Sequence, residues 1–174
     1  MTTRQMLRSV FGAAFLALTV ASGWAAAQAS PSPSTTLVVA GDVATALSLT
    51  SADLKTLPRV RVEAKSEDGT AHVYEGVLVA ELLKRAGAPV GAELRGNAFT
   101  TYVLASGSDG YQAVFSLAEL DPAFTSNDII VADAVDGKPL SNAQGAFRIA
   151  APKDARGSRS VRMLQRLDVV RLRK

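Results

Sequence analysis

No cysteine occurs among the 174 residues of this sequence. Its absence excludes thiolate nucleophiles, disulfide bridges, zinc sites with cysteine ligands and iron–sulfur clusters. Histidine occurs once, at His72, where we expect the surface of a strand rather than a catalytic base or a metal ligand. The sequence also lacks a nucleophile elbow, a phosphate-binding lysine loop and a zinc-protease helix motif. Most of the common catalytic chemistries are therefore excluded.

Aromatic residues are scarce at 6%, whereas hydrophobic residues make up 48% and charged residues 20% of the chain. This is an ordinary globular composition, and it excludes disordered, collagen-like and multi-span membrane classes. A single domain of ~150 residues buries ~70% of the surface that its unfolded chain exposes. We therefore expect one domain whose core needs neither a metal nor a disulfide bridge.

Acidic residues are absent from the first segment, which carries Arg4 and Arg8 ahead of the apolar run Val10–Val20. The run is too short for an ordinary membrane-spanning helix, and Ala27 and Ala29 supply small-residue cleavage sites. We therefore predict a secretory signal peptide, cleaved after Ala27 or Ala29, and a periplasmic location. An uncleaved membrane anchor is the alternative.

Three segments follow from this prediction. The signal peptide covers residues 1–29. Serine, proline and threonine dominate residues 30–36, which is typical of a flexible leader. The folded domain then covers residues 37–174, and no stable membrane insertion is expected after cleavage.

The formal net charge of +3 depends on the two arginines of the predicted signal peptide. Without them the chain keeps 17 of its 19 basic residues against 16 acidic ones, which argues against a nucleic-acid partner. Residues 153–174 hold 8 basic and 2 acidic side chains, whereas residues 30–152 hold 9 basic and 14 acidic ones. Positive charge is thus concentrated near the C-terminus, on a surface able to receive an anion.

The local patterns predict many short strands and few helices. Alternating or short apolar runs bounded by turn residues predict strands at 37–40, 47–49, 60–64, 72–75, 99–105, 111–116, 129–135, 147–151 and 164–172. A capping box of Thr50 and Asp53 predicts a short helix to Leu57, and apolar spacing predicts the clearest helix over Val77–Ala86. The fold class is therefore α+β, with a mixed β-sheet and short helices.

Residues 152–162 form a loop between two predicted strands. Arginine donates in a planar fork, serine adds hydroxyl groups, and Gly157 allows the backbone to approach a ligand closely. Such a loop is typical of a pocket for an anion or a heterocycle, and its expected binding residues are Arg156, Ser158, Arg159, Ser160 and Arg162. We expect Arg159 to contribute most. An exposed loop that only aids solubility is the alternative.

Several short motifs, taken in chain order, resemble the molybdopterin-binding domain of the sulfite oxidase family. They are Tyr74–Gly76, Leu82–Gly87, Ser108–Tyr111, Asp136–Leu140, Gly145 with Phe147–Arg148, Pro152 and Gly157–Leu164. The resemblance covers roughly residues 37–172 and implies a sulfite-oxidase-like fold. In that family the last motif wraps the pterin and its phosphate, and Arg159, Ser160, Val161 and Arg162 match its positions, with arginine replacing a lysine.

The same resemblance implies a pterin ligand, either a reduced pterin or molybdopterin. Asp109 would accept a hydrogen bond from a pterin amine, and Tyr111 would stack on the ring. The family holds molybdenum through a cysteine after the strand that matches Val60–Ala64, where this chain has Lys65 and its neighbours. The missing cysteine argues against a bound metal. Met163 also replaces a tryptophan that is usual in the enzymes.

The combination is similar to small stand-alone periplasmic proteins that bind a reduced pterin and report it to a membrane-bound signalling partner. That similarity implies a non-catalytic pterin sensor. One alternative is a molybdopterin-dependent oxidoreductase whose metal is held by the pterin alone or by oxygen ligands. Another is a partner-binding module whose basic tail, residues 166–174, meets an acidic surface or anionic lipid.

Overall fold

Two five-stranded sheets make up the domain in the computed structural model, which describes residues 35–66 and 68–173. The predicted signal peptide and most of the predicted leader lie outside the described residues. Within the described part of the chain, no helix is long and apolar enough to cross a membrane. The predicted α+β class is confirmed, although the strands form two sheets instead of one.

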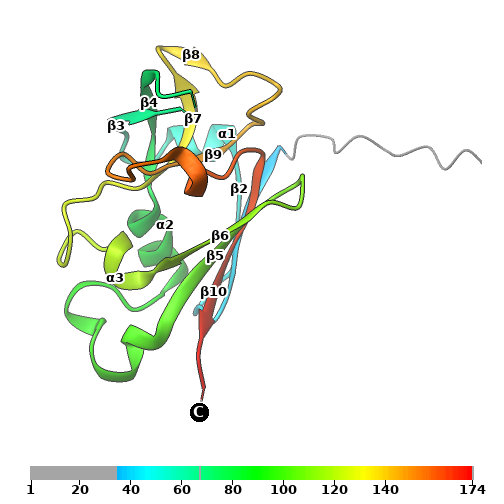
Figure 1. The fold of residues 1–174 in the computed structure, drawn as a ribbon. Helices are drawn as coiled ribbons and strands as arrows, with labels where there is room; N and C mark the ends of the chain where they lie inside the picture. The colour runs from blue at the N-terminus through cyan, green and yellow to red at the C-terminus, as the bar shows by residue number, and fades with distance from the viewer. Residues whose placement is uncertain (1–34, 67, 174) are drawn as a thin grey trace, which may run out of the picture. The chain divides into compact units, whose positions relative to one another are not determined.

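Sheet A joins the two ends of the domain. Its order is β2-β1-β10-β5-β6, with bounds Leu47–Thr50, Thr36–Gly41, Leu164–Arg171, Thr101–Gly107 and Gln112–Ser116. The strand β1 runs parallel to β10, with Val38 opposite Arg166, while all other pairs in the sheet are antiparallel. The C-terminal strand therefore lies in the middle of sheet A (Figure 1).

Sheet B is antiparallel throughout its described strands. The strands β3, β4, β7 and β8 follow one another, and β9 also pairs with β7; their bounds are Val60–Lys65, Ala71–Leu78, Ile130–Val135, Lys138–Pro139 and Arg148–Ala150. The pairing of β3 with β4 confirms the hairpin predicted from the alternating pattern. The same sheet brings β9, which precedes the basic loop, beside β7.

Short helices occupy the connections. They are α1 (Ser51–Lys55), α2 (Val79–Ala86), α3 (Leu117–Leu120) and the 3₁₀ turns η1 (Gly91–Glu93), η2 (Gly96–Thr100) and η3 (Gly157–Arg159). The predicted capping box at Thr50 and Asp53 is present at α1, and Ser116 with Glu119 forms a second one at α3. The helix α2 is capped at its C-terminal end by Gly87, whose φ of 74° is the left-handed conformation that glycine adopts readily.

The predicted start of the second helix is wrong by two residues. Val77 and Leu78 have the spacing of a helix face, but they extend β4 and lie opposite Val131 and Ile130 of β7. The cross-strand partners come from far along the chain, so the local pattern does not reveal them. The helix α2 contacts both β1 and β4, and Leu82 and Leu83 are buried in the main core.

Candidate functional site

The basic loop between β9 and β10 is fixed by backbone hydrogen bonds at both ends. Ile149 N–H donates to Val161 O at 2.9 Å, and Leu164 N–H donates to Phe147 O at 2.8 Å. In the same region Met163 N–H donates to Gln144 O at 2.7 Å. The loop is therefore held on β9 and on the segment that precedes it.

A hollow of about 260 Å³, here called the loop hollow, opens beside this loop. It is lined by Ser66, Asp68, Gln144, Arg148, Gly157, Ser160 and Arg162. Two of the predicted binding residues, Ser160 and Arg162, therefore lie at one cavity. Its lining includes guanidinium, hydroxyl, amide and carboxylate groups, which suits a small polar ring or an anion.

Arg148 is a buried cation at the loop hollow. Arg148 is only 5% exposed, and its Nη1 donates to the hydroxyl of Tyr74 at 3.0 Å. The guanidinium carbon lies 4.5 Å from the centre of the Tyr74 ring, within the range of a cation–π contact. Pairing of β9 with β7 places Arg148 opposite Ala132. These contacts fix the orientation of the Arg148 guanidinium beside the loop hollow.

Sequence reasoning did not assign a binding role to Arg148, Gln144, Ser66 or Asp68. One signal was available for Arg148, which is a single charge inside the apolar run from Ala146 to Ala151. A charge in a buried strand requires a polar partner or a functional reason. The other three residues carry no comparable signal, since they meet only through the tertiary fold.

Arg159 lies in a clamp of carboxylates. Its Nε and Nη2 donate to the two oxygens of Asp154 at 2.8 and 2.7 Å, and its Nη1 donates to Glu119 at 3.1 Å. The guanidinium also lies 4.8 Å from the centre of the Phe115 ring. The hydrogen bonds that Arg159 donates to Asp154, and then those to Glu119, raise the pKa of Arg159 above its ordinary value. These contacts tie the loop to α3 and β6.

The remaining predicted binding residues lie outside the lining of the loop hollow. Val161 is fully buried in the core, so its side chain packs against protein. Arg156 and Ser158 are exposed. Asp109 accepts from Tyr111 N–H at 3.0 Å and so stabilises its own turn. The Tyr111 hydroxyl donates to the Ser158 carbonyl, which joins the β5–β6 turn to the basic loop.

Asp68 supplies the carboxylate of the loop hollow. Its Oδ1 accepts from the Ser66 hydroxyl at 2.7 Å and from Thr70 N–H at 2.9 Å. The hydrogen bonds from Ser66, and then from Thr70, lower the pKa of Asp68 below its usual value. The group is therefore ionised near neutral pH and is able to accept from an amine or amide of a ligand.

The model of the oxidoreductase molybdopterin binding domain matches residues 25–174. The chain belongs to this family. Membership of the molybdopterin-binding family confirms the resemblance seen in the motifs and implies a pterin-type cofactor. A comparison with proteins of curated function gives no significant match.

A solved structure shares the fold of this molybdopterin-binding domain. It is the sulfane dehydrogenase SoxCD from Paracoccus pantotrophus, which matches with 20% sequence identity and a TM-score of 0.62. The match covers 79% of this chain and 38% of the SoxCD chain, so the chain spans well under half the length of that protein. The likeness confirms the sulfite-oxidase-like fold.

The residues of this family member fit a pterin better than they fit a thiolate-bound metal. At the end of β3, Lys65 offers an ammonium group and the Ser66 hydroxyl is engaged with Asp68 and Thr70. The sequence contains no cysteine, and residues 35–66 and 68–173 contain no cluster of three metal-ligating side chains. The donors of the loop hollow, in contrast, match the polar edge of a pterin.

Two arginines on β10 of the molybdopterin-binding domain, Arg166 and Arg171, have acidic partners. Arg166 Nε lies 2.6 Å from Asp168 Oδ2, and Arg171 Nε lies 3.2 Å from Asp42 Oδ2. These ion pairs neutralise part of the positive charge of residues 153–174. Elsewhere, the single histidine, His72, lies on β4 as predicted, with Nδ1 2.7 Å from Asp136 Oδ2.

Proposed function

We propose that this domain binds a reduced pterin in the loop hollow without catalysing oxidation, and that it reports the ligand to a membrane signalling partner in the periplasm. The observation that carries the proposal is the meeting of Arg148, Ser160 and Arg162 at one hollow. Those residues belong to two of the motifs on which the family resemblance rests.

The chemistry of a pterin edge explains this choice of ligand. The ring presents a carbonyl acceptor beside amine and amide donors, so it needs both cationic donors and a carboxylate acceptor. Arg148 and Arg162 supply donors, and Asp68 supplies the acceptor. In this proposal Asp68 takes the role that the sequence suggested for Asp109, and Arg159 holds the loop in place without touching the ligand.

The proposed lack of catalysis rests on the position after β3. A protein thiolate would be the ligand for molybdenum there, whereas Lys65 ends the strand and Ser66 follows it. A protonated lysine has no lone pair to give to a metal. The domain therefore keeps the pterin donors and lacks the thiolate.

A molybdopterin-dependent oxidoreductase is the second candidate. The family description names an oxidoreductase domain, and the similar structure SoxCD is a dehydrogenase. In this case the same arginines would hold the molybdopterin, and the metal would take oxygen or pterin ligands. Stoichiometric molybdenum in protein purified from its native host would favour this candidate, whereas metal-free protein carrying a pterin would favour the sensor.

A titration with tetrahydropterin, followed by ligand fluorescence, tests the proposed site. We expect saturable binding that Arg162→Gln weakens about tenfold, because a charge-assisted hydrogen bond contributes about 1.5–3 kcal/mol. Arg95→Gln is the matched control, since Arg95 is also exposed and is remote from the hollow in sequence. Equal affinity of the two variants would contradict the site assignment.

The proposed location and partner need separate experiments. A fusion of the chain to a reporter enzyme that is active only outside the cytoplasm should be active, if residues 1–29 direct export. Deletion of those residues should abolish the reporter signal. Cross-linking of the exported protein to membrane proteins with and without added tetrahydropterin tests the signalling role, which requires a cross-link that depends on the ligand.

A further inference from the structure

A second and larger cavity lies on the other face of sheet B. It measures about 480 Å³ and shares no lining residue with the loop hollow. Tyr74, which contacts Arg148, and Glu75, which lines this cavity, are consecutive residues of β4. Consecutive side chains of a strand leave opposite faces, so the sheet separates the two sites. We call this site the Arg59 cavity.

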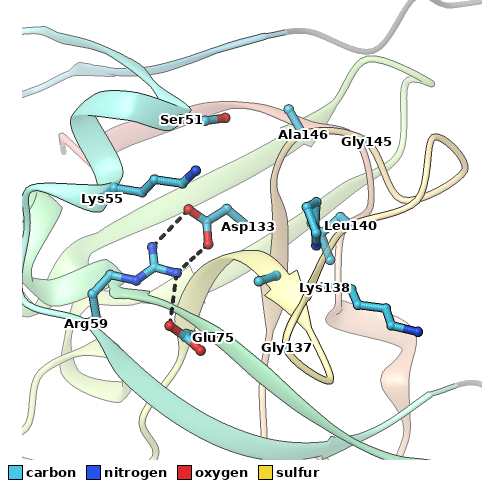
Figure 2. A pocket seen from close by; sticks show the side chains of 12 residues that line it. Ser51, Lys55, Arg59, Glu75, Asp133, Gly137, Lys138, Leu140, Gly145 and Ala146 are labelled. Atoms are coloured by element: carbon cyan, nitrogen blue, oxygen red, sulfur yellow. Dashed lines mark hydrogen bonds and ion pairs between the residues drawn. The ribbon is translucent and has the colours of Figure 1, made fainter.

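The floor of the Arg59 cavity is a rigid group of paired charges (Figure 2). Arg59 donates through Nη1 and Nη2 to the two oxygens of Asp133 at 2.9 and 2.6 Å. The Asp133 side chain is only 5% exposed. Glu75 lies 3.6 Å from Arg59 and accepts from Arg61 Nε at 3.0 Å. Two carboxylates thus meet two guanidiniums, and the floor has no net charge of its own.

One wall of the cavity carries two polar donors, Ser51 and Lys55, on α1. Ser51 and Lys55 are four residues apart on α1, and in Figure 2 the Lys55 side chain extends toward Asp133 while Ser51 lies beside it. Within residues 35–66 and 68–173, neither the Ser51 hydroxyl nor the Lys55 ammonium has a hydrogen-bond or ion-pair partner. The cavity therefore gains its net positive charge from Lys55.

The opposite wall is apolar. Figure 2 shows Leu140 and Ala146 across the cavity from α1, and Pro139 is a further apolar lining residue. Lys138 also borders the site, but its ammonium points away from the other side chains. An occupant would place a charged end near Lys55 and a hydrocarbon body against Leu140. The volume falls within the usual range for a small-molecule site of ~300–1,000 Å³.

We propose that the Arg59 cavity binds a small organic carboxylate with an apolar body, such as a short fatty acid or an aromatic acid. The carboxylate accepts from Lys55 Nζ and Ser51 Oγ, while Leu140 and Ala146 contact the hydrocarbon part. A cationic ligand is disfavoured because Asp133 and Glu75 are already neutralised by Arg59 and Arg61. This site goes beyond the proposed pterin function and does not depend on it.

Nuclear magnetic resonance titration of the purified protein with hexanoate, 1-hexanol and hexylamine tests the proposal. These probes share a chain length and differ in charge. Hexanoate should shift the backbone amides of Lys55 and Leu140 in a saturable way, 1-hexanol should shift them weakly, and hexylamine should leave them unchanged. Equal shifts from hexylamine or 1-hexanol would overturn the proposal.

Two substitutions on α1 sharpen the test, with a control on α2. Lys55→Met keeps the hydrocarbon stem and should weaken hexanoate binding about tenfold, while Ser51→Ala should weaken it about threefold. Lys84→Met changes another exposed lysine in the last turn of a helix and should have no effect. Arg162→Gln should also leave hexanoate binding unchanged, which separates this site from the pterin site. Unchanged affinity in Lys55→Met would refute the assignment.

Discussion

Arg159 and Arg162 lie three residues apart in one loop and have opposite surroundings. Arg159 is held by Asp154 and Glu119 and lies over Phe115. Arg162 is exposed, lines the loop hollow, and has no ion-pair partner within the described residues. The charge of an arginine therefore does not by itself show whether its guanidinium is available to a ligand. Asp154 and Glu119 occupy the guanidinium of Arg159, whereas Arg162 has no ion-pair partner among the described residues.

The largest expected effect comes from displacing the end of the loop that carries Arg162. Gly145 has a φ of 79°, and a Cβ there would lie 2.6 Å from Met163 Cα. Gly145→Ala combines left-handed strain with a clash against backbone, so we expect the free energy of unfolding to fall by about 3 kcal/mol. Urea denaturation followed by circular dichroism measures this loss in the free energy of unfolding.

Gly137→Ala is the matched control for that prediction. Its φ is 73°, but no atom beyond Gly137 and its two chain neighbours lies within 4 Å of the added Cβ. Only the backbone strain remains, so the expected loss is about 1 kcal/mol. Similar losses in the two variants would show that contact with Met163 does not determine the conformation of Gly145.

A smaller loss of stability should follow removal of the clamped arginine. Arg159→Met removes three charge-assisted hydrogen bonds and leaves Asp154, whose side chain is 13% exposed, without its partner. Arg159 itself is 36% exposed, which reduces the effect, so we expect a loss of about 1–2 kcal/mol in chemical denaturation. Arg156→Met, in the same loop, should stay within about 0.5 kcal/mol of the wild type.

Arg162→Gln should show the reverse pattern to Arg159→Met. Because Arg162 is exposed and unpaired within the described residues, its replacement should change the free energy of unfolding by no more than about 0.5 kcal/mol. The same variant should lose pterin affinity by more than Arg159→Met does. A larger loss of affinity in Arg159→Met would restore the initial expectation that Arg159 dominates binding.

The smallest expected loss of stability concerns the exposed pair of His72 and Asp136, which lies outside the basic loop. Hydrogen bonds from His72, and then from Val73 N–H, lower the pKa of Asp136 below its usual value of 3.8. A lowered folded-state pKa stabilises the protein above the unfolded-state pKa, and the contribution disappears as pH falls through the folded value. Asp136→Asn should therefore be less stable than the wild type at neutral pH.

Stability measured across the acid range checks this prediction. The two unfolding free energies should converge as pH falls through the lowered folded-state pKa of Asp136, where the wild-type carboxylate takes up its proton. Asparagine tolerates the positive φ of 49° at this position, so backbone strain does not confuse the comparison. Asp128→Asn, at an exposed position, should differ little from the wild type at any pH. A constant difference for Asp136→Asn would contradict the role of ionisation.

Local signals predicted most of the elements. The capping box of Thr50 and Asp53, the stop at Gly87 and the alternation in β3 and β4 all act between near neighbours in the chain. The division into two sheets and the extension of β4 through Leu78 depend on pairing with distant strands. The periodicity of a single segment carries no information about such partners.

Local signals in the sequence also pointed to part of the lining of the candidate site. The composition of the loop pointed to Ser160 and Arg162, which the fold places at the loop hollow. It could not separate Arg162 from Arg159, because Glu119 reaches the clamp from 40 residues away. The placement of Arg148 at the hollow required the pairing of β9 with β7.

The central place of β10 in sheet A governs the order in which this domain can be completed. During synthesis, β1 and β5 leave the ribosome long before Leu164–Arg171, the strand that must lie between them. Until then each of the two strands has one edge of unpaired backbone groups, which are available for wrong pairing. A nascent chain that stops before β10 therefore cannot close sheet A. Sheet A can therefore be completed only after β10 has been synthesised.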